Sequence, residues 1–317
     1  MKVIITTPSF GKFHNGLIKR MEEKGCEVVK LIPYSREQMV EEIKNADAWI
    51  IGLEAADEDL LQYANQLKLI AKHGVGVDNI DIEAASARGI AVTNAPGTNN
   101  DAVADLAFGL MLSVARAIPE ANHLVKRGGW GRFDGVSVWG KTLGVIGLGA
   151  IGRGVVKRGK GFNMHVLGYD VSPPSQEEVA LSIERVSLKE LLQTSDYISL
   201  HVPLNQYTKA MIGEDEFSLM KPNAILINTA RGGIIDEKAL YEALLARKIR
   251  GCGLDVFEQG PPVSSQLMGL ENLVTTPHIG AYTNEAVQLT SEMSVENVYR
   301  LVNGETLKNV VNELKLV

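Results

Sequence analysis

Residues 142–170 read TLGVIGLGAIGRGVVKRGKGFNMHVLGYD, and this stretch indicates the class of fold. A short apolar run typical of a buried strand leads into a G-x-G-x-x-G spacing, a helical pattern follows, and a second strand ends at Asp170. Gly147 permits a tight turn, Gly149 lets backbone N–H groups approach a pyrophosphate, and Gly152 lets the helix pack closely on its strand. The helix N-terminus supplies a positive dipole end. This order predicts a dinucleotide-binding unit rather than a merely structural glycine turn.

Asp170 bears on which dinucleotide is bound. A carboxylate at this strand end accepts hydrogen bonds from the ribose hydroxyls of NAD and repels the 2′-phosphate of NADP. Val171 and Ser172 follow it, with no arginine to favour the phosphate. NAD is therefore the expected cofactor, although a purely capping role for Asp170 would leave the preference open.

On both sides of this unit, short apolar runs alternate with helical patterns, which is typical of parallel sheets covered by helices on both faces. The helix at 102–116 is apolar almost all round, so we expect it to be buried in a core or in a subunit interface. We expect strands at 2–6, 27–32, 48–52, 67–72, 141–146, 166–169, 197–200, 224–228, 251–255 and 273–275, and the other helices at 15–24, 36–45, 60–65 and 286–302.

Composition narrows the class of protein. The chain has 317 residues, enough for two domains, and is 45% hydrophobic and 22% charged. Its net charge of −6, without a basic cluster, argues against nucleic acid or an anionic membrane as a partner. Cys26 and Cys252 lie far apart, so neither a disulfide framework nor a thiolate metal site is expected. Without a signal peptide or a long apolar run, a cytoplasmic protein is expected.

Two residues that each follow a predicted strand could act in hydride transfer to a carbonyl. That reaction needs a proton donor and a cation. His278 follows a strand in TPHIG, and Arg231 follows another in NTARGG, at the sheet edge where α/β proteins bind ligands. His201 also ends a strand, where cofactor contact and structural packing are equally plausible. The remaining histidines have no companion motif: His14, His73, His123 and His165.

Taken together, six segments resemble the D-isomer-specific 2-hydroxyacid dehydrogenase family, in its phosphoglycerate-dehydrogenase-like branch. They are HGVGVDNID (73–81), TNAPGTNNDAVAD (93–105), the glycine loop (140–153), INTARGGIIDE (227–237), GLDVF (253–257) and TPHIGA (276–281). The resemblance implies two doubly wound parallel-sheet α/β domains. A Rossmann NAD-binding domain (99–283) would be inserted into a flavodoxin-like substrate domain (1–98 and 284–317). It also implies a homodimer formed through the helix near 103–122.

The resemblance further implies the roles of individual residues. Arg231 would bind the substrate carboxylate and carbonyl oxygen, and His278 would exchange the proton. The backbone of Gly74, Val75 and Gly76 would hold the carboxylate. Residues implied to contact NAD are Gly147, Gly149, Ala150, Ile151, Gly152, Asp170, Val202, Pro203, Thr208, Thr229, Ala230, Asp255 and Gly280.

Two positions depart from the family pattern. The family has a glutamate that orients the catalytic histidine, where this chain has Gly260; Glu258 could compensate. Phosphoglycerate enzymes have an Arg-Ser pair near the third strand, where this chain has Glu54, which would repel a phosphate unless Lys72, Lys12 or a partner subunit supplies charge.

The resulting expectation is an NAD-dependent dehydrogenase of a small D-2-hydroxy acid, with no metal. One alternative is a D-3-phosphoglycerate dehydrogenase of the short form, which lacks a C-terminal regulatory domain and would serve serine biosynthesis. The other is an NAD(H)-sensing binding protein without turnover, an interpretation that rests on Gly260.

Overall fold

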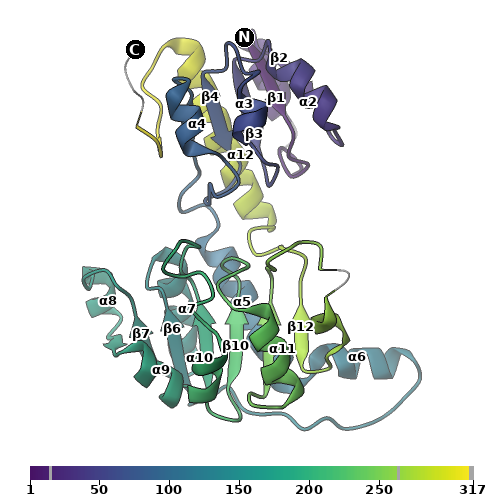
Figure 1. The fold of residues 1–317 in the computed structure, drawn as a ribbon, viewed down its shortest axis with the longest axis vertical. Helices are drawn as coiled ribbons and strands as arrows, with labels where there is room; N and C mark the ends of the chain where they lie inside the picture. The colour runs from purple at the N-terminus through teal and green to yellow at the C-terminus, as the bar shows by residue number, and fades with distance from the viewer. Residues whose placement is uncertain (14–15, 263–264, 314–317) are drawn as a thin grey trace. The chain divides into compact units, whose positions relative to one another are not determined.

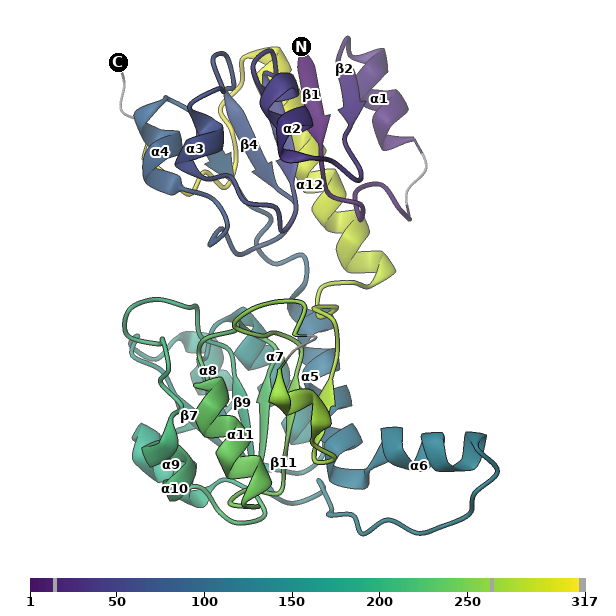
Figure 2. The same cartoon turned by 45° about the vertical axis from the view of Figure 1, so that its right-hand side comes forward.

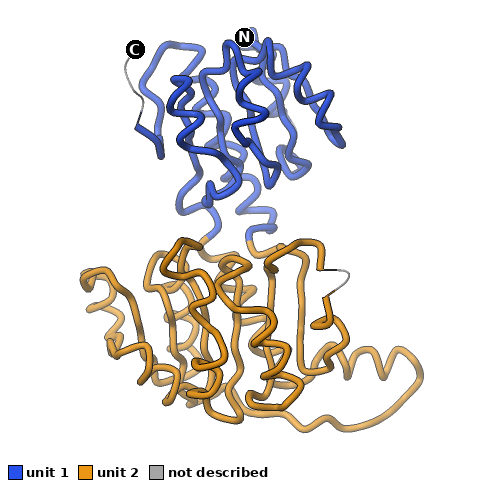
Figure 3. The backbone as a smooth tube through the Cα atoms, in the orientation of Figure 1, with its two compact units in different colours: residues 1–99, 281–317 blue, residues 100–280 orange. Residues whose placement is uncertain are grey.

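The structure, a computed structural model, divides the chain into two compact units (Figure 3). Unit 1 comprises Met1–Asn99 and Ala281–Val317, and unit 2, inserted between them, comprises Asn100–Gly280. The boundaries expected from the sequence, after residues 98 and 283, lie beside these. The described residues are 1–13, 16–262 and 265–313, so His14 lies outside them.

Unit 1 contains a five-stranded sheet in which every pairing is parallel. Its strand order, β2-β1-β3-β4-β5, is the flavodoxin-like order of doubly wound proteins, as predicted. The strands are β1 (Lys2–Ile5), β2 (Glu27–Lys30), β3 (Ala48–Ile51), β4 (Leu69–Lys72) and β5 (Ala91–Thr93).

Helices cover both faces of this sheet, which is why β3 is buried along its whole length. Trp49 packs into the core on one face and Ile50 into the core on the other. The helices are α1 (Leu17–Glu23), α2 (Arg36–Ile43), α3 (Glu58–Leu61), α4 (Ile82–Ala87) and α12 (Asn284–Asn303). The last of these returns from the far end of the sequence, and its Val295 and Val298 are buried in the second core.

Unit 2 contains a seven-stranded sheet, also parallel throughout, in the order β12-β11-β10-β9-β6-β7-β8. From β6 the chain first adds β7 and β8 on one side of the sheet and then adds β9 to β12 on the other side. The boundary between β6 and β9 is therefore the switch point at which doubly wound sheets bind ligands. The strands are β6 (Thr142–Ile146), β7 (His165–Tyr169), β8 (Glu184–Arg185), β9 (Tyr197–Leu200), β10 (Ile225–Asn228), β11 (Gly251–Leu254) and β12 (Leu273–Thr275).

The helices of unit 2 form two layers around this sheet (Figures 1 and 2). One layer contains α5 (Asn100–Arg116) and α7 (Ala150–Gly161); the other contains α9 (Leu188–Thr194), α10 (Glu214–Leu219) and α11 (Glu237–Leu245). The short α8 (Gln176–Ala180) precedes β8, and the 3₁₀ turn η1 (Gln266–Gly269) precedes β12. The remaining helix, α6 (Ile118–Lys126), extends away from the rest of the unit with the segment that follows it.

The single helix expected near 103–122 is wrong, because α5 and α6 meet at a bend of 65°. Ala117, between them, has φ 48°, a left-handed conformation that ends α5. The apolar side chains of α5 are explained by burial within unit 2, where Asp105 also binds Arg158 of α7 at 2.7 Å. Large exposed apolar side chains instead follow the bend, as the 49% exposure of Ile118 shows.

Helix α3 also differs from its expected range of 60–65. It begins earlier because the carboxylate of Asp57 accepts a hydrogen bond from the backbone N–H of Leu60 at 2.9 Å and caps the helix. Among the described residues, no single helix has the length and apolar composition to span a membrane; only α5 and α6 counted together do, across their bend.

His73, directly after β4, lies half-buried between two serines of unit 1. Its Nε2 lies 2.8 Å from Ser291 Oγ and its Nδ1 lies 3.2 Å from Ser9 Oγ. Burial, together with the nearby charge of Lys72, lowers the pKa of His73 to about 4. In this range the unfolded chain binds more protons than the folded one, so stability falls as the pH drops from about 6.5 towards 4.

We therefore expect His73→Gln to reduce the acid sensitivity of unit 1 between about pH 6.5 and 4. The measurement is urea unfolding at several pH values, followed by the emission of Trp49, which is fully buried in unit 1. Trp130 and Trp139 belong to unit 2 and are largely exposed. His165→Gln, at an exposed pair in unit 2, is the control; an unchanged pH slope in His73→Gln would contradict the expectation.

Candidate active site

The glycine loop between β6 and α7 is shaped by close backbone contacts. Gly147 has φ 93°, and a Cβ there would lie 2.5 Å from the carbonyl oxygen of His201. A Cβ on Gly152 would lie 2.0 Å from the carbonyl oxygen of Gly147. Both positions therefore require glycine, and the start of α7 lies directly against the loop.

The middle glycine of the motif faces open space. A Cβ on Gly149 would meet nothing within 4 Å, and Gly149 and Ala150 are both exposed. No side chain among the described residues caps α7, so the first-turn N–H groups face outward. Such a helix end has the geometry and the dipole direction to bind a pyrophosphate.

Asp170 lies beside this loop at the end of β7. Its carboxylate accepts hydrogen bonds from the backbone N–H groups of Leu148 at 2.7 Å and Ser172 at 2.8 Å. Burial acts to raise the pKa of Asp170, but these two hydrogen bonds, together with one from the Ser172 side chain and the charge of Arg185, lower the pKa below its usual value. The carboxylate is thus fixed and ionised, and it caps the turn besides being available to a ribose. Arg185, which sequence reasoning did not consider, contacts the same turn.

The loop after β9 brings together the residues proposed for the adenine side. Thr208 Oγ1 donates a hydrogen bond to the carbonyl of Pro203 at 2.6 Å, which closes the turn that begins at Val202. His201 is packed beneath it, and burial lowers its pKa to about 3, so it is neutral. Its Nε2 lies 2.8 Å from Ser199 Oγ, while Nδ1 is buried and has no partner among the described residues.

The turn after β10 is held by the buried side chain of Asn228. Its amide donates to the carbonyl of Arg231 at 2.8 Å and accepts from the N–H of Ala230 at 3.0 Å. The hydroxyl of Thr229 is buried without a partner among the described residues, as expected of a group that a ligand would satisfy. A Cβ on Gly232 would lie 1.9 Å from the carbonyl oxygen of Phe257, so this turn packs against the loop that follows β11.

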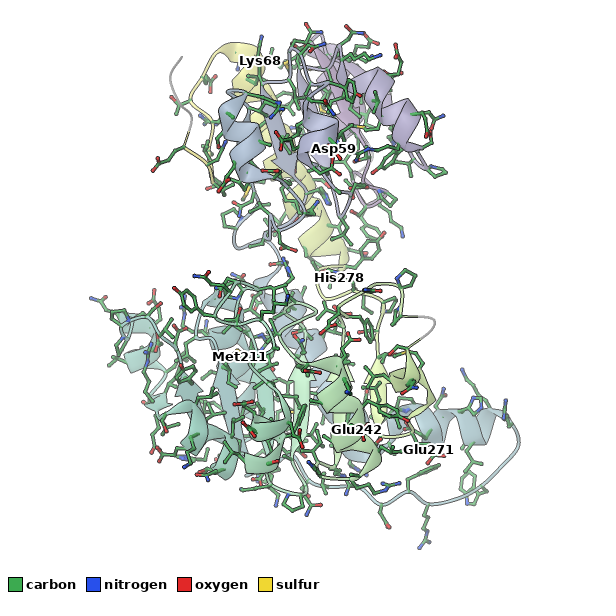
Figure 4. All side chains as sticks on the ribbon, in the orientation of Figure 1. Asp59, Lys68, Met211, Glu242, Glu271 and His278 are labelled. Carbon is green, nitrogen blue, oxygen red and sulfur yellow. The ribbon has the colours of Figure 1, made fainter. Side chains whose placement is uncertain are left out.

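Asp255 has a structural task that sequence reasoning missed. Its side chain is 1% exposed, and its carboxylate accepts hydrogen bonds from Thr276 Oγ1 at 2.6 Å and from the N–H groups of Ile279 and Gly280, both at 2.8 Å. Within this clamped turn His278 has φ 54°, a conformation unfavourable for a non-glycine residue, and its side chain is exposed (Figure 4).

Gly260, where the family has a glutamate, is exposed, and a Cβ there would meet nothing within 4 Å. Glu258 is also exposed, and its backbone N–H donates to the Glu237 carboxylate at 2.6 Å. A Cβ on Gly233 would lie 3.9 Å from the Glu258 side chain. Glu258 thus lies beside the turn that carries Arg231.

The loop Gly74–Gly76 belongs to unit 1, whereas Arg231 and His278 belong to unit 2. The carbonyl of Gly74 accepts from the N–H of Ala95 at 2.8 Å, and that of Val75 accepts from Asn94 Nδ2 at 2.7 Å. Within the described part of the chain, the N–H groups of 74–76 donate no hydrogen bond. Fixed carbonyls and unused N–H groups fit a site for an anion such as a carboxylate.

Replacing Asp255 should loosen the turn that holds His278. Asparagine offers one accepting oxygen and directs an N–H₂ group at a backbone donor, so we expect Asp255→Asn to lower the free energy of unfolding by about 1–3 kcal/mol. Hydrogen exchange at the amides of Ile279 and Gly280 should accelerate. Thr276→Val, which removes one of the three bonds, is the graded control; equal exchange in the two variants would contradict the clamp.

Comparisons with known proteins agree with this arrangement. Residues 108–280 match the family described as D-isomer specific 2-hydroxyacid dehydrogenase, NAD binding domain. The chain is 46% identical to a D-3-phosphoglycerate dehydrogenase of Methanocaldococcus jannaschii, over 98% of this chain but only 59% of that protein's length. It is 45% identical to a glyoxylate reductase of Thermococcus litoralis, over 87% of this chain and 86% of that protein.

Solved structures give the same result. The TT0316 protein from Thermus thermophilus superposes with a TM-score of 0.90 and 35% identity, over 98% of this chain and 100% of that one. The two parallel-sheet units and these matches together establish the relationship. The chain therefore belongs to the D-isomer specific 2-hydroxyacid dehydrogenase family and carries its NAD-binding domain.

Proposed function

We propose that this protein is an NAD-dependent oxidoreductase that interconverts a small D-2-hydroxy acid and its 2-keto acid. The observation that carries the proposal is the turn in which Asp255 clamps two backbone N–H groups and keeps His278 in a left-handed conformation. Strain of this kind persists where the surrounding structure requires one arrangement. Arg231 follows β10 at the same edge of the sheet, so a proton donor and a cation come from one sheet.

In the proposed mechanism, NAD supplies and accepts the hydride when it is bound. Arg231 binds the substrate carboxylate and polarises the carbonyl oxygen. His278 donates a proton to that oxygen during reduction and takes the proton back from the hydroxyl during oxidation. The backbone N–H groups of Gly74, Val75 and Gly76 are proposed to bind the carboxylate.

The residues around the glycine loop fit a dinucleotide. The open space at Gly149 and the outward N–H groups of α7 support a pyrophosphate there, and the ionised Asp170 supports NAD over NADP. The buried hydroxyl of Thr229 supports a further contact. The other residues we propose for the cofactor are Gly147, Ala150, Ile151, Gly152, Val202, Pro203, Thr208, Ala230, Asp255 and Gly280.

The substrate we propose is unphosphorylated, such as glyoxylate or hydroxypyruvate. Glu54 at the end of β3 is fixed, because its Oε2 accepts from the N–H of Gly52 at 2.6 Å. Lys72, a buried cation, donates one hydrogen bond to the carbonyl of Gly52. It donates a second one to Asn79 Oδ1, at 2.6 Å. A phosphate near this edge would meet a fixed carboxylate and an ammonium that is already hydrogen-bonded, so it is disfavoured.

We also propose that the protein forms a homodimer, with α6 and the segment after it as the contact in place of the helix at 103–122. Ile118 and Val125 on α6 are 49% and 54% exposed, and Trp130 and Trp139 are 93% and 65% exposed. Apolar side chains so exposed on one extended arm are typical of a surface covered by a partner.

Turnover by the wild-type protein with NADH should identify the substrate. A panel of phosphohydroxypyruvate, hydroxypyruvate, glyoxylate, pyruvate and branched 2-keto acids would be measured by NADH oxidation, with NADPH as a control. Arg231→Gln should lower kcat/KM by about 10²–10³-fold because a transition-state contact is lost. NADH binding, followed by fluorescence, should stay unchanged. Arg231→Lys, which keeps the charge without the planar fork, should give an intermediate rate.

Two outcomes would favour the alternatives. A clear preference for phosphohydroxypyruvate would contradict the argument from Glu54 and favour a D-3-phosphoglycerate dehydrogenase. Tight NADH binding without turnover of any keto acid would contradict the enzyme and favour an NAD(H)-sensing protein.

A carboxylate at Gly260 should improve the enzyme. The open space there accepts a side chain, so we expect Gly260→Glu to raise kcat by about tenfold by orienting the catalytic histidine. A nearby negative charge favours imidazolium, so keto-acid reduction should persist to higher pH. Gly260→Gln, equal in size and uncharged, is the control. If Gly260→Glu and Gly260→Gln had the same pH profile, this loop would not reach His278.

A further inference from the structure

We infer that the ion pair between Glu178 and Arg185 is a specificity device: it withholds from a 2′-phosphate an arginine that already lies beside Asp170. The inference rests on the proposed dinucleotide function and goes beyond it, because it assigns the NAD preference to a pair of residues on α8 and β8. Asp170 is then one of two determinants.

Arg185 is brought to this position by sheet pairing. Strand β8 pairs with β7, with Arg185 opposite Gly168, two residues before Asp170. The guanidinium Nη1 donates to the carbonyl of Ser172 at 2.6 Å and to that of Asp170 at 3.3 Å. The arginine thus contacts the same turn whose N–H groups fix the Asp170 carboxylate.

Glu178 binds the other side of the guanidinium. Its Oε2 lies 2.8 Å from Arg185 Nε and 2.6 Å from Nη2, and its side chain is only 7% exposed. The same carboxylate closes a capping box, in which Oε1 accepts from the N–H of Ser175 at 3.2 Å. Glu178 is therefore held in place by the helix start as well as by the arginine.

The net charge of this site determines whether a 2′-phosphate is attracted or repelled. Asp170 and Glu178 against Arg185 leave one negative charge, which repels a phosphate. Glu177, the neighbouring carboxylate on α8, is held by hydrogen bonds at the helix start, which lower its pKa, and the charge of Arg153 adds a smaller effect in the same direction. Helix α8 thus presents the carboxylate of Glu178 to Arg185.

Removing the charge of Glu178 should release Arg185 to a new anion. The arginine side chain is 23% exposed, while its Nη2 is buried against Glu178, so a phosphate would approach from the exposed side of the arginine. A guanidinium without its carboxylate then gains charge-assisted hydrogen bonds from phosphate oxygens, which are stronger than those to neutral groups. The unphosphorylated ribose of NAD offers no such gain.

The test measures binding of two fragments by calorimetry, 2′,5′-ADP and 5′-AMP, which differ by the 2′-phosphate. We expect Glu178→Gln to raise the affinity for 2′,5′-ADP relative to 5′-AMP by about tenfold or more. Glutamine keeps the capping box, since Gln serves at this position as Glu does, so the fold is preserved. The matched control is Glu184→Gln, next to Arg185 but paired with His165 at 3.2 Å, and its ratio should equal the wild-type ratio.

Two further variants identify the arginine as the cause. Arg185→Gln added to Glu178→Gln should abolish the gain. Asp170→Asn alone should change the ratio by less than about tenfold, because Arg185 stays paired. This arm tests the inference even if Glu178→Gln fails to fold.

Three results would overturn the inference. The first is equal ratios in Glu178→Gln and Glu184→Gln, the second is a gain that survives the loss of Arg185, and the third is full acceptance of 2′,5′-ADP by Asp170→Asn. If the wild type binds 5′-AMP normally in these cases, the proposed dinucleotide function stands. If the wild type binds neither fragment nor NADH, that function fails and this inference fails with it.

Discussion

The contact on which unit 2 depends is the approach of Gly152 to the carbonyl of Gly147, where a single added carbon would lie 2.0 Å from the oxygen. This contact places the first turn of α7 directly after β6, at the switch point of the sheet. Because no side chain in the described part of the chain caps the helix there, its N–H groups face the open space at Gly149. The pyrophosphate site that we propose there is therefore a consequence of backbone packing.

The other site elements are held by buried or half-buried polar side chains at the same sheet edge. Asn228 fixes the turn of Arg231, Asp255 fixes the turn of His278, and Asp170 fixes the glycine loop. Each uses side-chain oxygen or nitrogen atoms to satisfy backbone groups that a sharp turn leaves unpaired. A residue that is expected to touch the cofactor can thus be needed first for the shape of the loop that surrounds it.

Much of this arrangement could be predicted from the sequence, because it rests on local patterns. The glycine spacing and the apolar runs predicted both parallel sheets, and β9 and β12 were found at their predicted residues. The left-handed conformation of Ala117 itself could not be predicted, since alanine rarely adopts it, although Pro119 in the first turn of α6 does indicate that a new helix starts there. Nor could the clamp by Asp255, whose partners lie more than twenty residues later and meet it only through the pairing of β11 with β12.

Contacts made through strand pairing also explain why cofactor specificity cannot be predicted from the residues just after a strand alone. Neither of the residues after Asp170, Val171 and Ser172, is an arginine. Pairing of β8 with β7 nevertheless brings Arg185, fifteen residues after Asp170, to the same turn. The arginine is therefore present at the turn where we propose that the ribose binds, and we infer that its effect depends on the carboxylate that neutralises it. We infer that Asp170 at the strand end and the ion pair between α8 and β8 act on the same phosphate, so that the charge of the whole cluster, not of one residue, would determine which dinucleotide is favoured.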